Sequence, residues 1–478
     1  MRAEFELRGK RVLVVGLART GVAASLFCAA RGARVTSTDR KPRSELAETV
    51  MILAPAGVSF ALGGHDQANV REQDLIVVSP GVPVNAPLLE EARKIGIPVW
   101  SEIELAWRFL RGKLVAITGS NGKTTVTSLV AHILKAAGIA TLVGGNIGVP
   151  LLSLVDSSTD SSVTVAEISS FQLENIDEFR PEIGVLLNLT PDHLDRHESF
   201  NEYARAKMRM FENQDNHDVA ILNADDAEVT RRLPSGPRVY WFSRQNAVAA
   251  GAFLLGEEIV FRADGGEAPL LPRADIGLRG DHNVENVLAA CAAAFLVGAP
   301  VAGIAAGVKS FPGVEHRLEF VADIEGVHFY NDSKATNVDA ALKAIEAFPK
   351  PQVASEKGRL IVILGGKDKG SPYTPLREPL SARARDVLLI GAAAEKIAVD
   401  LEGAAPIEKV GTLDRAVEIA RSKAKSGDVV LLAPACSSFD QFENYEQRGR
   451  IYKELVTKLS SQSAAPASKD KDRKANAT

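Results

Sequence analysis

Several features are scarce in this sequence, and each absence excludes a class of protein. Only three cysteines, Cys28, Cys291 and Cys436, occur in 478 residues. Their odd number and wide spacing argue against a disulfide framework and for reduced thiols in the cytosol. The net charge of −4 provides no broad basic field, so nucleic acid is not an expected partner.

Long apolar runs are also missing. The most apolar helix-like stretch, residues 287–297, is too short to span a bilayer. The N-terminus, residues 1–11, alternates in charge and lacks the apolar region of a secretory signal. We therefore expect a cytoplasmic protein that is not inserted in a membrane.

The sequence does contain α/β patterning throughout its length. Short apolar runs alternate with segments of helical periodicity, which is typical of α/β domains with mostly parallel sheets. The expected strands are residues 10–15, 33–39, 74–79, 113–119, 163–168, 182–189, 359–364, 386–390 and 428–433.

The chain length predicts two to four domains, and the pattern favours three α/β domains. We expect a Rossmann-like N-terminal domain at 1–111 and a central domain of the P-loop ATPase type at 112–313. A C-terminal Rossmann-like domain at 314–460 follows. Residues 461–478 are polar and poor in apolar residues, and we expect a disordered tail there.

The strongest motif is a phosphate-binding loop. Residues 116–125 read AITGSNGKTT and lie between a predicted strand and an amphipathic helix that begins at about Lys123. The backbone amides of a glycine turn and of a helix N-terminus favour a polyphosphate. We expect Lys123 to reach the β and γ oxygens and Thr124 to ligate Mg²⁺. The motif departs from the general GxxxxGK[ST] pattern, because Ile117 stands where the first glycine would be.

Polar residues also follow the next two predicted strands. Glu167 ends one strand and His193 follows the other, and this pair suits Mg²⁺ or Mn²⁺ near a phosphate. The residues alone leave a second interpretation open, in which Glu167 caps a helix and His193 makes a loop hydrogen bond. His197, one helical turn further, is expected to be a solvated loop residue.

These motifs resemble the Mur ligase family, whose superfamily includes the folylpolyglutamate synthases. The TGSNGKTT loop first carries the resemblance, which then extends to about residue 460. Folylpolyglutamate synthases place this loop near the N-terminus, whereas here an α/β block precedes it, so the order favours a Mur ligase. The family's reaction uses ATP to phosphorylate a carboxylate, and an amine then attacks the acyl phosphate.

Within the family, residues 167–174 (EISSFQLE) and 190–197 (TPDHLDRH) look most like the branch that adds D-glutamate. The branch that adds L-alanine is the nearest rival, because it shares a Rossmann-like first domain. The resemblance implies UDP-N-acetylmuramoyl-L-alanine and D-glutamate as substrates, in peptidoglycan precursor synthesis. It also implies ATP and Mg²⁺ (or Mn²⁺) as cofactors, and we expect a monomer.

The resemblance assigns the reacting groups. Lys123, His193 and Lys207 are the expected catalytic residues. The family carbamylates a lysine at the position of Lys207 with CO₂, which would change its charge from positive to negative and let it help hold a second metal ion. The expected metal ligands are Thr124, Glu167, His193 and Lys207 if it is carbamylated.

The resemblance also assigns the nucleotide and amino-acid sites. Asn283 has an alternative role as a helix cap, residues 331–337 could form an ordinary surface loop, and Lys367 competes with Lys369. The expected nucleotide-binding residues are Gly119, Ser120, Asn121, Gly122, Lys123, Thr124, Thr125, Asn283, Asn286, Arg317, Asp332 and Lys334. Those expected near the incoming amino acid are Thr336, Lys369, Ser438, Phe439 and Tyr445.

The first block allows two interpretations. Its turn, residues 16–21, has Ala18 in place of the middle glycine of GxGxxG, and Asp39 follows about 20 residues on. This pattern leaves an NAD oxidoreductase open, although that function would leave the 119–125 loop unexplained. A nucleotide-gated binding protein without ligase chemistry is a third class, disfavoured by the presence of Glu167, His193 and Lys207. The resemblance instead implies a UDP-substrate site formed by Arg19, Thr20, Asp39, Arg40, Ser79, Gly81 and Asn146.

Overall fold

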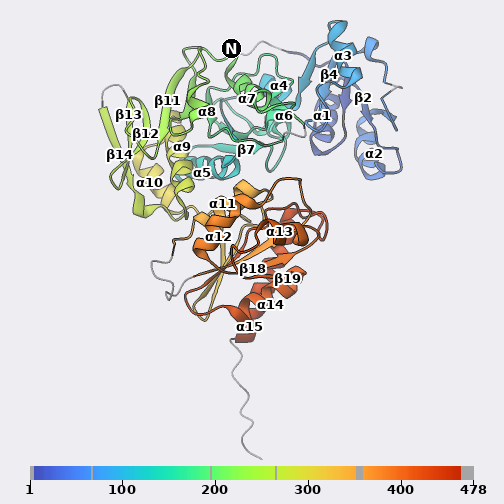
Figure 1. The fold of residues 1–478 in the computed structure, drawn as a ribbon. Helices are drawn as coiled ribbons and strands as arrows, with labels where there is room; N and C mark the ends of the chain where they lie inside the picture. The colour runs from blue at the N-terminus through green and yellow to red at the C-terminus, as the bar shows by residue number, and fades with distance from the viewer. Residues whose placement is uncertain (1–4, 66–67, 194–195, 264–265, 351–358, 464–478) are drawn as a thin grey trace, which may run out of the picture. The chain divides into compact units, whose positions relative to one another are not determined.

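The computed structural model describes residues 5–65, 68–193, 196–263, 266–350 and 359–463. Its strands form three sheets, and the chain divides into two compact units (Figure 1). Unit 1 comprises Met1–Gly277 and Asn283–Pro312 and contains the first two sheets. Unit 2 comprises Leu278–His282 and Gly313–Thr478 and contains the third. The expectation of a disordered tail over 461–478 is wrong for residues 461–463, which are helical, and the rest of that tail lies outside the described residues.

The first sheet has five parallel strands in the order β3-β2-β1-β4-β5. Both faces of such a sheet are covered, so its central strands are continuous apolar runs. The strands are β1 (Arg11–Val15), β2 (Arg34–Asp39), β3 (Ser59–Leu62), β4 (Leu75–Val78) and β5 (Val99–Ser101). The helices are α1 (Arg19–Ala30), α2 (Ala47–Leu53), α3 (Pro87–Lys94) and α4 (Glu102–Phe109).

The second sheet has nine strands in the order β14-β13-β12-β11-β10-β9-β6-β8-β7. Strands β6 to β12 form the parallel part of this sheet, and β13 and β14 extend one edge as an antiparallel hairpin (Figure 1). The strands are β6 (Lys113–Thr118), β7 (Thr141–Gly145), β8 (Val163–Glu167), β9 (Ile183–Leu186), β10 (Val219–Asn223), β11 (Arg238–Ser243), β12 (Gly251–Leu255), β13 (Glu258–Ala263) and β14 (Gly266–Pro272). The helices are α5 (Lys123–Ala136), α6 (Ser170–Leu173), α7 (Phe200–Met208), α8 (Ala227–Thr230), α9 (Asp281–Val297) and α10 (Val301–Lys309).

The third sheet has six strands in the order β15-β16-β20-β17-β18-β19, of which only β15 is antiparallel to its neighbour. One core packs α11, α12 and α13 on one face, and a second packs α14 and α15 on the other. The strands are β15 (Glu319–Ile324), β16 (Val327–Asn331), β17 (Leu360–Gly365), β18 (Ala384–Ile390), β19 (Ile407–Gly411) and β20 (Val429–Leu432). The helices are α11 (Val338–Glu346), α12 (Arg377–Arg383), α13 (Ala394–Asp400), α14 (Leu413–Lys423) and α15 (Tyr445–Ser463).

The predicted α/β pattern is confirmed. Each strand expected from the sequence overlaps an observed strand, and the predicted helix from Lys123 is α5. No helix in the described part of the chain is long and apolar enough to cross a bilayer.

Candidate active site

The predicted phosphate loop joins β6 to α5, as its sequence indicates. Gly122 has a φ of +85° and precedes the first helical residue, Lys123. A side chain at Gly122 would be strained in this conformation and would also collide with Asn286 Oδ1. Lys123 Nζ donates to the carbonyl oxygens of Gly119 and Ser120, each at 2.8 Å. The ammonium group of Lys123 therefore lies against the predicted phosphate-binding loop.

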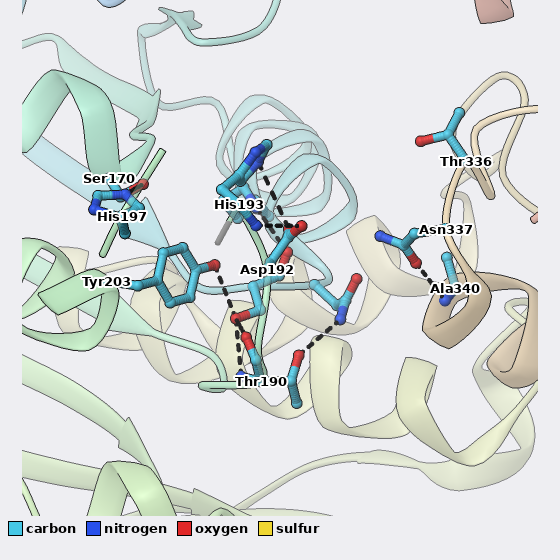
Figure 2. A network of polar contacts seen from close by, with 12 residues as sticks. Ser170, Thr190, Asp192, His193, His197, Tyr203, Thr336, Asn337 and Ala340 are labelled. Carbon is cyan, nitrogen blue, oxygen red and sulfur yellow. Dashed lines mark hydrogen bonds and ion pairs between the residues drawn. The ribbon is translucent and has the colours of Figure 1, made fainter. Parts of the chain in front are cut away.

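The segment after β9 holds the loop in place. Ser120 Oγ donates to the Thr190 carbonyl at 2.9 Å, accepts from the Thr190 amide at 2.9 Å, and lies 2.9 Å from the Tyr203 hydroxyl (Figure 2). The Asn121 amide donates to Asn188 Oδ1 at 2.8 Å. The loop is thus pre-shaped by side chains, which lowers the ordering cost of binding a polyphosphate.

Asn283 and Asn286 lie on the first turns of α9, beside the loop. Asn286 Nδ2 donates to Asn283 Oδ1 at 2.9 Å, and both residues are buried. Because α9 begins at Asp281, Asn283 is inside the helix and not at its cap. The alternative of a capping role is therefore wrong.

A buried carboxylate lies beside the start of α5. Glu167, the last residue of β8, is 2% exposed and accepts a hydrogen bond from Thr124 Oγ1 at 2.8 Å through one oxygen. Its other oxygen accepts from Asn146 Nδ2 at 2.8 Å. The alternative of a helix-capping role for Glu167 is wrong, because Ser169 caps the helix that follows.

The Thr124 and Glu167 pair fits a hard divalent cation. Mg²⁺ is commonly held by one or two carboxylates, a hydroxyl, water and substrate phosphates. A hydroxyl and a carboxylate oxygen 2.8 Å apart can face one such ion. Among the described residues, no group of three or more His, Cys, Asp or Glu side chains forms a metal cage. A cation bound by Thr124 and Glu167 would therefore take its remaining ligands from water and from the phosphates of the substrate.

Lys207 is not the surface lysine that its sequence context would suggest. It is 2% exposed on α7, and its Nζ donates to the Gly119 carbonyl at 2.9 Å and to Thr118 Oγ1 at 3.4 Å. Burial and the positive charge of Lys123 hold the pKa of Lys207 well below its usual value, against the opposing effect of Asp192 and Glu167. Burial therefore shifts the protonation equilibrium of Lys207 toward the neutral amine.

His193 follows β9 and is half-exposed. Its φ is +53°, its side chain is 50% exposed, and its amide donates to Asp192 Oδ1 at 3.0 Å (Figure 2). Its ring centroid is 5.0 Å from that of Phe171. The side chain is thus accessible to a ligand while its backbone is held in a strained conformation, which is common at functional sites.

The prediction that His197 is solvated is wrong. His197 is 6% exposed, and its Nε2 lies 3.0 Å from Ser170 Oγ (Figure 2). Its ring also stacks on Phe171. Burial, together with His193 and nearby cations, lowers the pKa of His197. The neighbouring aromatic rings, which the sequence did not place, account for its burial.

Most of the residues predicted to bind a UDP-substrate lie at the strand ends of the first sheet, whereas Asn146 follows β7 of the second sheet. Asp39 accepts from the Leu17 amide at 2.7 Å and from the Lys41 amide at 2.9 Å, one through each carboxylate oxygen. Ser79 Oγ donates to the Gly16 carbonyl at 2.7 Å. The remaining predicted residues, Arg19, Thr20, Arg40, Gly81 and Asn146, are exposed or half-buried. Asp39 and Ser79 therefore shape the turn, while Arg19 and Arg40 are exposed and Thr20 is half-buried.

In unit 2, Arg317, Asp332 and Lys334 gather at the end of β16. Asp332 is buried, which raises its pKa to about 7, against the opposing charges of Arg317 and Lys334. Arg317 Nε is buried and makes no hydrogen bond within the described residues. The Lys334 ammonium lies 5.4 Å from the ring centroid of Tyr445. This is a polar cluster in which Arg317 Nε is an unused donor, and the alternative of an ordinary surface loop is wrong for Asp332, which is 7% exposed.

The residues predicted near the amino acid lie in the loops that follow β16, β17 and β20 and at the start of α15. Lys369 Nζ contacts Thr336 Oγ1 at 3.5 Å. Ser438 is 2% exposed, whereas Phe439 is 68% exposed. Lys367, the competing lysine, pairs its backbone with Ser437.

Two buried residues at the site escaped the sequence analysis. Tyr203 contacts Ser120, as described above. Arg448 is fully buried and donates to Ser333 Oγ at 2.9 Å and to the Cys436 carbonyl at 3.2 Å. Tyr203 lies four residues before Lys207 and Arg448 lies three residues after Tyr445, but nothing in residue type or spacing separates them from core and surface positions.

Comparison with known proteins assigns the chain to a family. Three family models match in order: a Mur ligase MurD-like N-terminal domain over residues 10–101, a Mur ligase middle domain over 117–294, and a Mur ligase glutamate ligase domain over 316–436. A curated relative from Acidobacterium capsulatum is 55% identical and covers 95% of this chain and 97% of its own length. The chain belongs to the Mur ligase family. Like other Mur ligases, it is an ATP-dependent enzyme that forms amide bonds.

The similar proteins carry a consistent name. The Acidobacterium capsulatum relative is a UDP-N-acetylmuramoylalanine–D-glutamate ligase, as is one from Koribacter versatilis that is 52% identical over 96% of this Mur ligase and 99% of its own length. Solved structures share the fold at lower identity. A pseudomurein peptide ligase from Methanothermus fervidus has a TM-score of 0.57 at 21% identity and covers 94% of this chain and 100% of its own. A UDP-N-acetylmuramate–alanine ligase from Thermotoga maritima has a TM-score of 0.56 at 20% identity and covers 94% of this chain and 99% of its own. The predicted fold class and family are confirmed, and an NAD oxidoreductase is set aside.

Proposed function

We propose that this Mur ligase joins D-glutamate to UDP-N-acetylmuramoyl-L-alanine through an acyl phosphate, releasing ADP and phosphate. The names of relatives at 52–55% identity support the choice of substrates over those of the L-alanine-adding branch. The observation that carries the chemistry is the buried Thr124 and Glu167 pair beside the phosphate loop of Lys123.

The phosphate loop would hold ATP. The loop amides and the N-terminus of α5 present partial positive charge to the phosphates, and Lys123 would turn from the loop carbonyls toward the β and γ oxygens. The residues proposed for nucleotide binding in unit 1 are Gly119, Ser120, Asn121, Gly122, Lys123, Thr124, Thr125, Asn283 and Asn286. In unit 2, Arg317 has an unused buried donor for a phosphate, Asp332 has a carboxylate for ribose, and Lys334 has a cation for the reacting end.

Thr124 and Glu167 would hold Mg²⁺ (or Mn²⁺), with His193 as a further ligand or as an orienting group for the tetrahedral species. Bound, the ion would neutralise charge on the transferring phosphoryl group. We also propose that Lys207 is carbamylated. Its burial and depressed pKa support this, because the neutral amine is the form that attacks CO₂.

The UDP-substrate and D-glutamate would bind at strand ends of the sheets, as the ATP phosphates would at the end of β6. Arg19, Thr20, Asp39, Arg40, Ser79, Gly81 and Asn146 are proposed for the UDP-substrate. Thr336, Lys369, Ser438, Phe439 and Tyr445 are proposed for D-glutamate, whose two carboxylates need cationic and hydroxyl donors. The three free, buried cysteines support a cytoplasmic location. We further propose a monomer, which light scattering of the 51.0 kDa chain would test.

A panel of substrates tests the proposed function. Phosphate release from ATP is measured with UDP-N-acetylmuramoyl-L-alanine fixed and single amino acids varied. Release that depends on D-glutamate is expected. Release driven instead by L-alanine with UDP-N-acetylmuramate would move the assignment to the L-alanine-adding branch.

A further inference from the structure

Two loops of unit 2 carry residues that we propose to bind D-glutamate. The first follows β17 and contains Lys369, and the second follows β20 and contains Ser438. Strands β17 and β20 are parallel neighbours, so both loops leave the same edge of the sheet. The Lys367 amide donates to the Ser437 carbonyl at 2.9 Å, and Ser437 Oγ donates back to the Lys367 carbonyl at 3.1 Å. The loops are thus joined next to the proposed site.

A side-chain relay reinforces this junction. The Tyr373 hydroxyl donates to Asp368 Oδ1 at 2.9 Å and lies 2.9 Å from Cys436 Sγ. Because a hydroxyl has a single hydrogen, which goes to Asp368, the Cys436 thiol is the donor in the second contact. Tyr373 is 1% exposed and Cys436 is fully buried. The relay therefore connects the loop of Ser438 to the residue that precedes Lys369.

The charge of Asp368 is already satisfied. Lys396 Nζ, from α13, donates to Asp368 Oδ2 at 2.8 Å and to the Ser371 carbonyl at 3.1 Å. One carboxylate oxygen thus faces Tyr373 and the other faces Lys396. Without these donors, the Asp368 carboxylate would be free to pair with the ammonium of the next residue, Lys369.

Lys369 remains available for a ligand. Within the described residues Lys369 forms no ion pair, and its Nζ contacts Thr336 Oγ1 at 3.5 Å. An ammonium without an internal counter-ion is suited to an external carboxylate.

We propose that Tyr373 and Lys396 are positioning residues for D-glutamate, which hold Asp368 away from Lys369 so that Lys369 can bind a carboxylate of the incoming amino acid. This inference rests on the proposed function. It assigns no step of the reaction to Tyr373 or Lys396, and it predicts an effect on one substrate only.

Steady-state kinetics of the full-length enzyme test the proposal. Tyr373→Phe keeps the ring and removes the hydroxyl, so the KM for D-glutamate should rise roughly three- to tenfold, the scale of one hydrogen bond. The KM values for ATP and UDP-N-acetylmuramoyl-L-alanine, and kcat at saturating D-glutamate, should stay within about twofold. Lys396→Gln should act in the same direction, and Lys396→Arg should restore the wild-type KM.

Tyr452→Phe is the matched control. Tyr452 is also fully buried in unit 2, and its hydroxyl donates to the Val430 carbonyl at 3.3 Å, in the core and not at the loops. This control should leave the KM for D-glutamate unchanged. The proposal is overturned if Tyr373→Phe and Lys396→Gln leave that KM unchanged, or if Tyr373→Phe and Tyr452→Phe raise the KM values of all substrates alike. Failure of the proposed function would show separately, as wild-type enzyme that releases no phosphate with D-glutamate.

Discussion

Lys123 is the residue on which phosphate handling depends most. Its ammonium lies 2.8 Å from two carbonyl oxygens of the loop, at the start of α5. Replacing Lys123 with Ala removes a preorganised charge, and kcat should fall by at least ~10²-fold. Phosphate release at saturating substrates measures this. Lys135→Ala, an exposed lysine in the last turn of the same helix, should retain wild-type turnover.

Lys207 gives a second prediction at this scale. If a carbamate on Lys207 supplies a negative charge, Lys207→Ala should lose most of its activity, and an added small carboxylate such as acetate should restore part of it. The rescue is measured as phosphate release with and without acetate, with Lys123→Ala as the variant that acetate should not rescue. Wild-type activity in Lys207→Ala would remove the carbamate from the account.

Residue type predicted some of the site and not the rest. Thr124, Glu167 and Lys123 could be placed from sequence, because a glycine loop between strand and helix and a polar strand end have a known geometry. His197 could not, since its burial depends on stacking against Phe171, and neither could Tyr203, whose hydroxyl reaches a loop 83 residues away. Tertiary contacts of this kind leave no local pattern.

At the scale of elements, α4 contains a buried carboxylate that the proposed reaction does not use. Glu102 is 1% exposed, and one of its oxygens accepts from the Leu152 amide at 2.7 Å. The other oxygen is buried without a hydrogen bond in the described residues. Burial raises the pKa of Glu102 to about 7, although the amides of Leu152 and Leu151 oppose the shift.

The sign of the effect on stability follows from linkage. Between about pH 4.5 and 7 the folded chain keeps a proton that the unfolded chain has lost, so stability falls as the pH rises through this window. Glu102→Gln is neutral at every pH. The free energy of unfolding of Glu102→Gln, relative to that of wild type, should therefore rise by about 2–3 kcal/mol from pH 5 to pH 8. This rise is measured as an increase in the Tm difference between the variant and wild type. Parallel Tm curves for wild type and Glu102→Gln would contradict the prediction, and exposed Glu48→Gln serves as the control.

The predictability of each element depended largely on its burial. Most central parallel strands were found because burial on both faces makes them continuous apolar runs, as in LIVV of β4 and LIVILG of β17. Strand β10 (VAILN) was missed although all of its residues are buried. The hairpin of β13 and β14 was not predicted, because it lies at a sheet edge where charged and proline residues interrupt the pattern. Edge strands are defined by their neighbours more than by their own sequence.

At the scale of the whole molecule, each of the three sheets carries proposed site residues at its strand ends. The turn after β1 carries residues for the UDP-substrate, the loop after β6 carries those for the phosphates of ATP, and the loops after β17 and β20 carry most of those for D-glutamate. In parallel sheets the carboxyl ends of the strands are where ligands bind. One fold principle, used three times, accounts for a ligase with three substrates.

The central claim is that the terminal phosphoryl group of ATP passes to the carboxylate of the acceptor. This can be tested by labelling both oxygens of that carboxylate with ¹⁸O and analysing the released phosphate by mass spectrometry. An acyl phosphate keeps one carboxylate oxygen on phosphorus when the amine displaces phosphate, so one ¹⁸O per phosphate is predicted. Unlabelled phosphate, formed at the same rate as the amide product, would contradict the account.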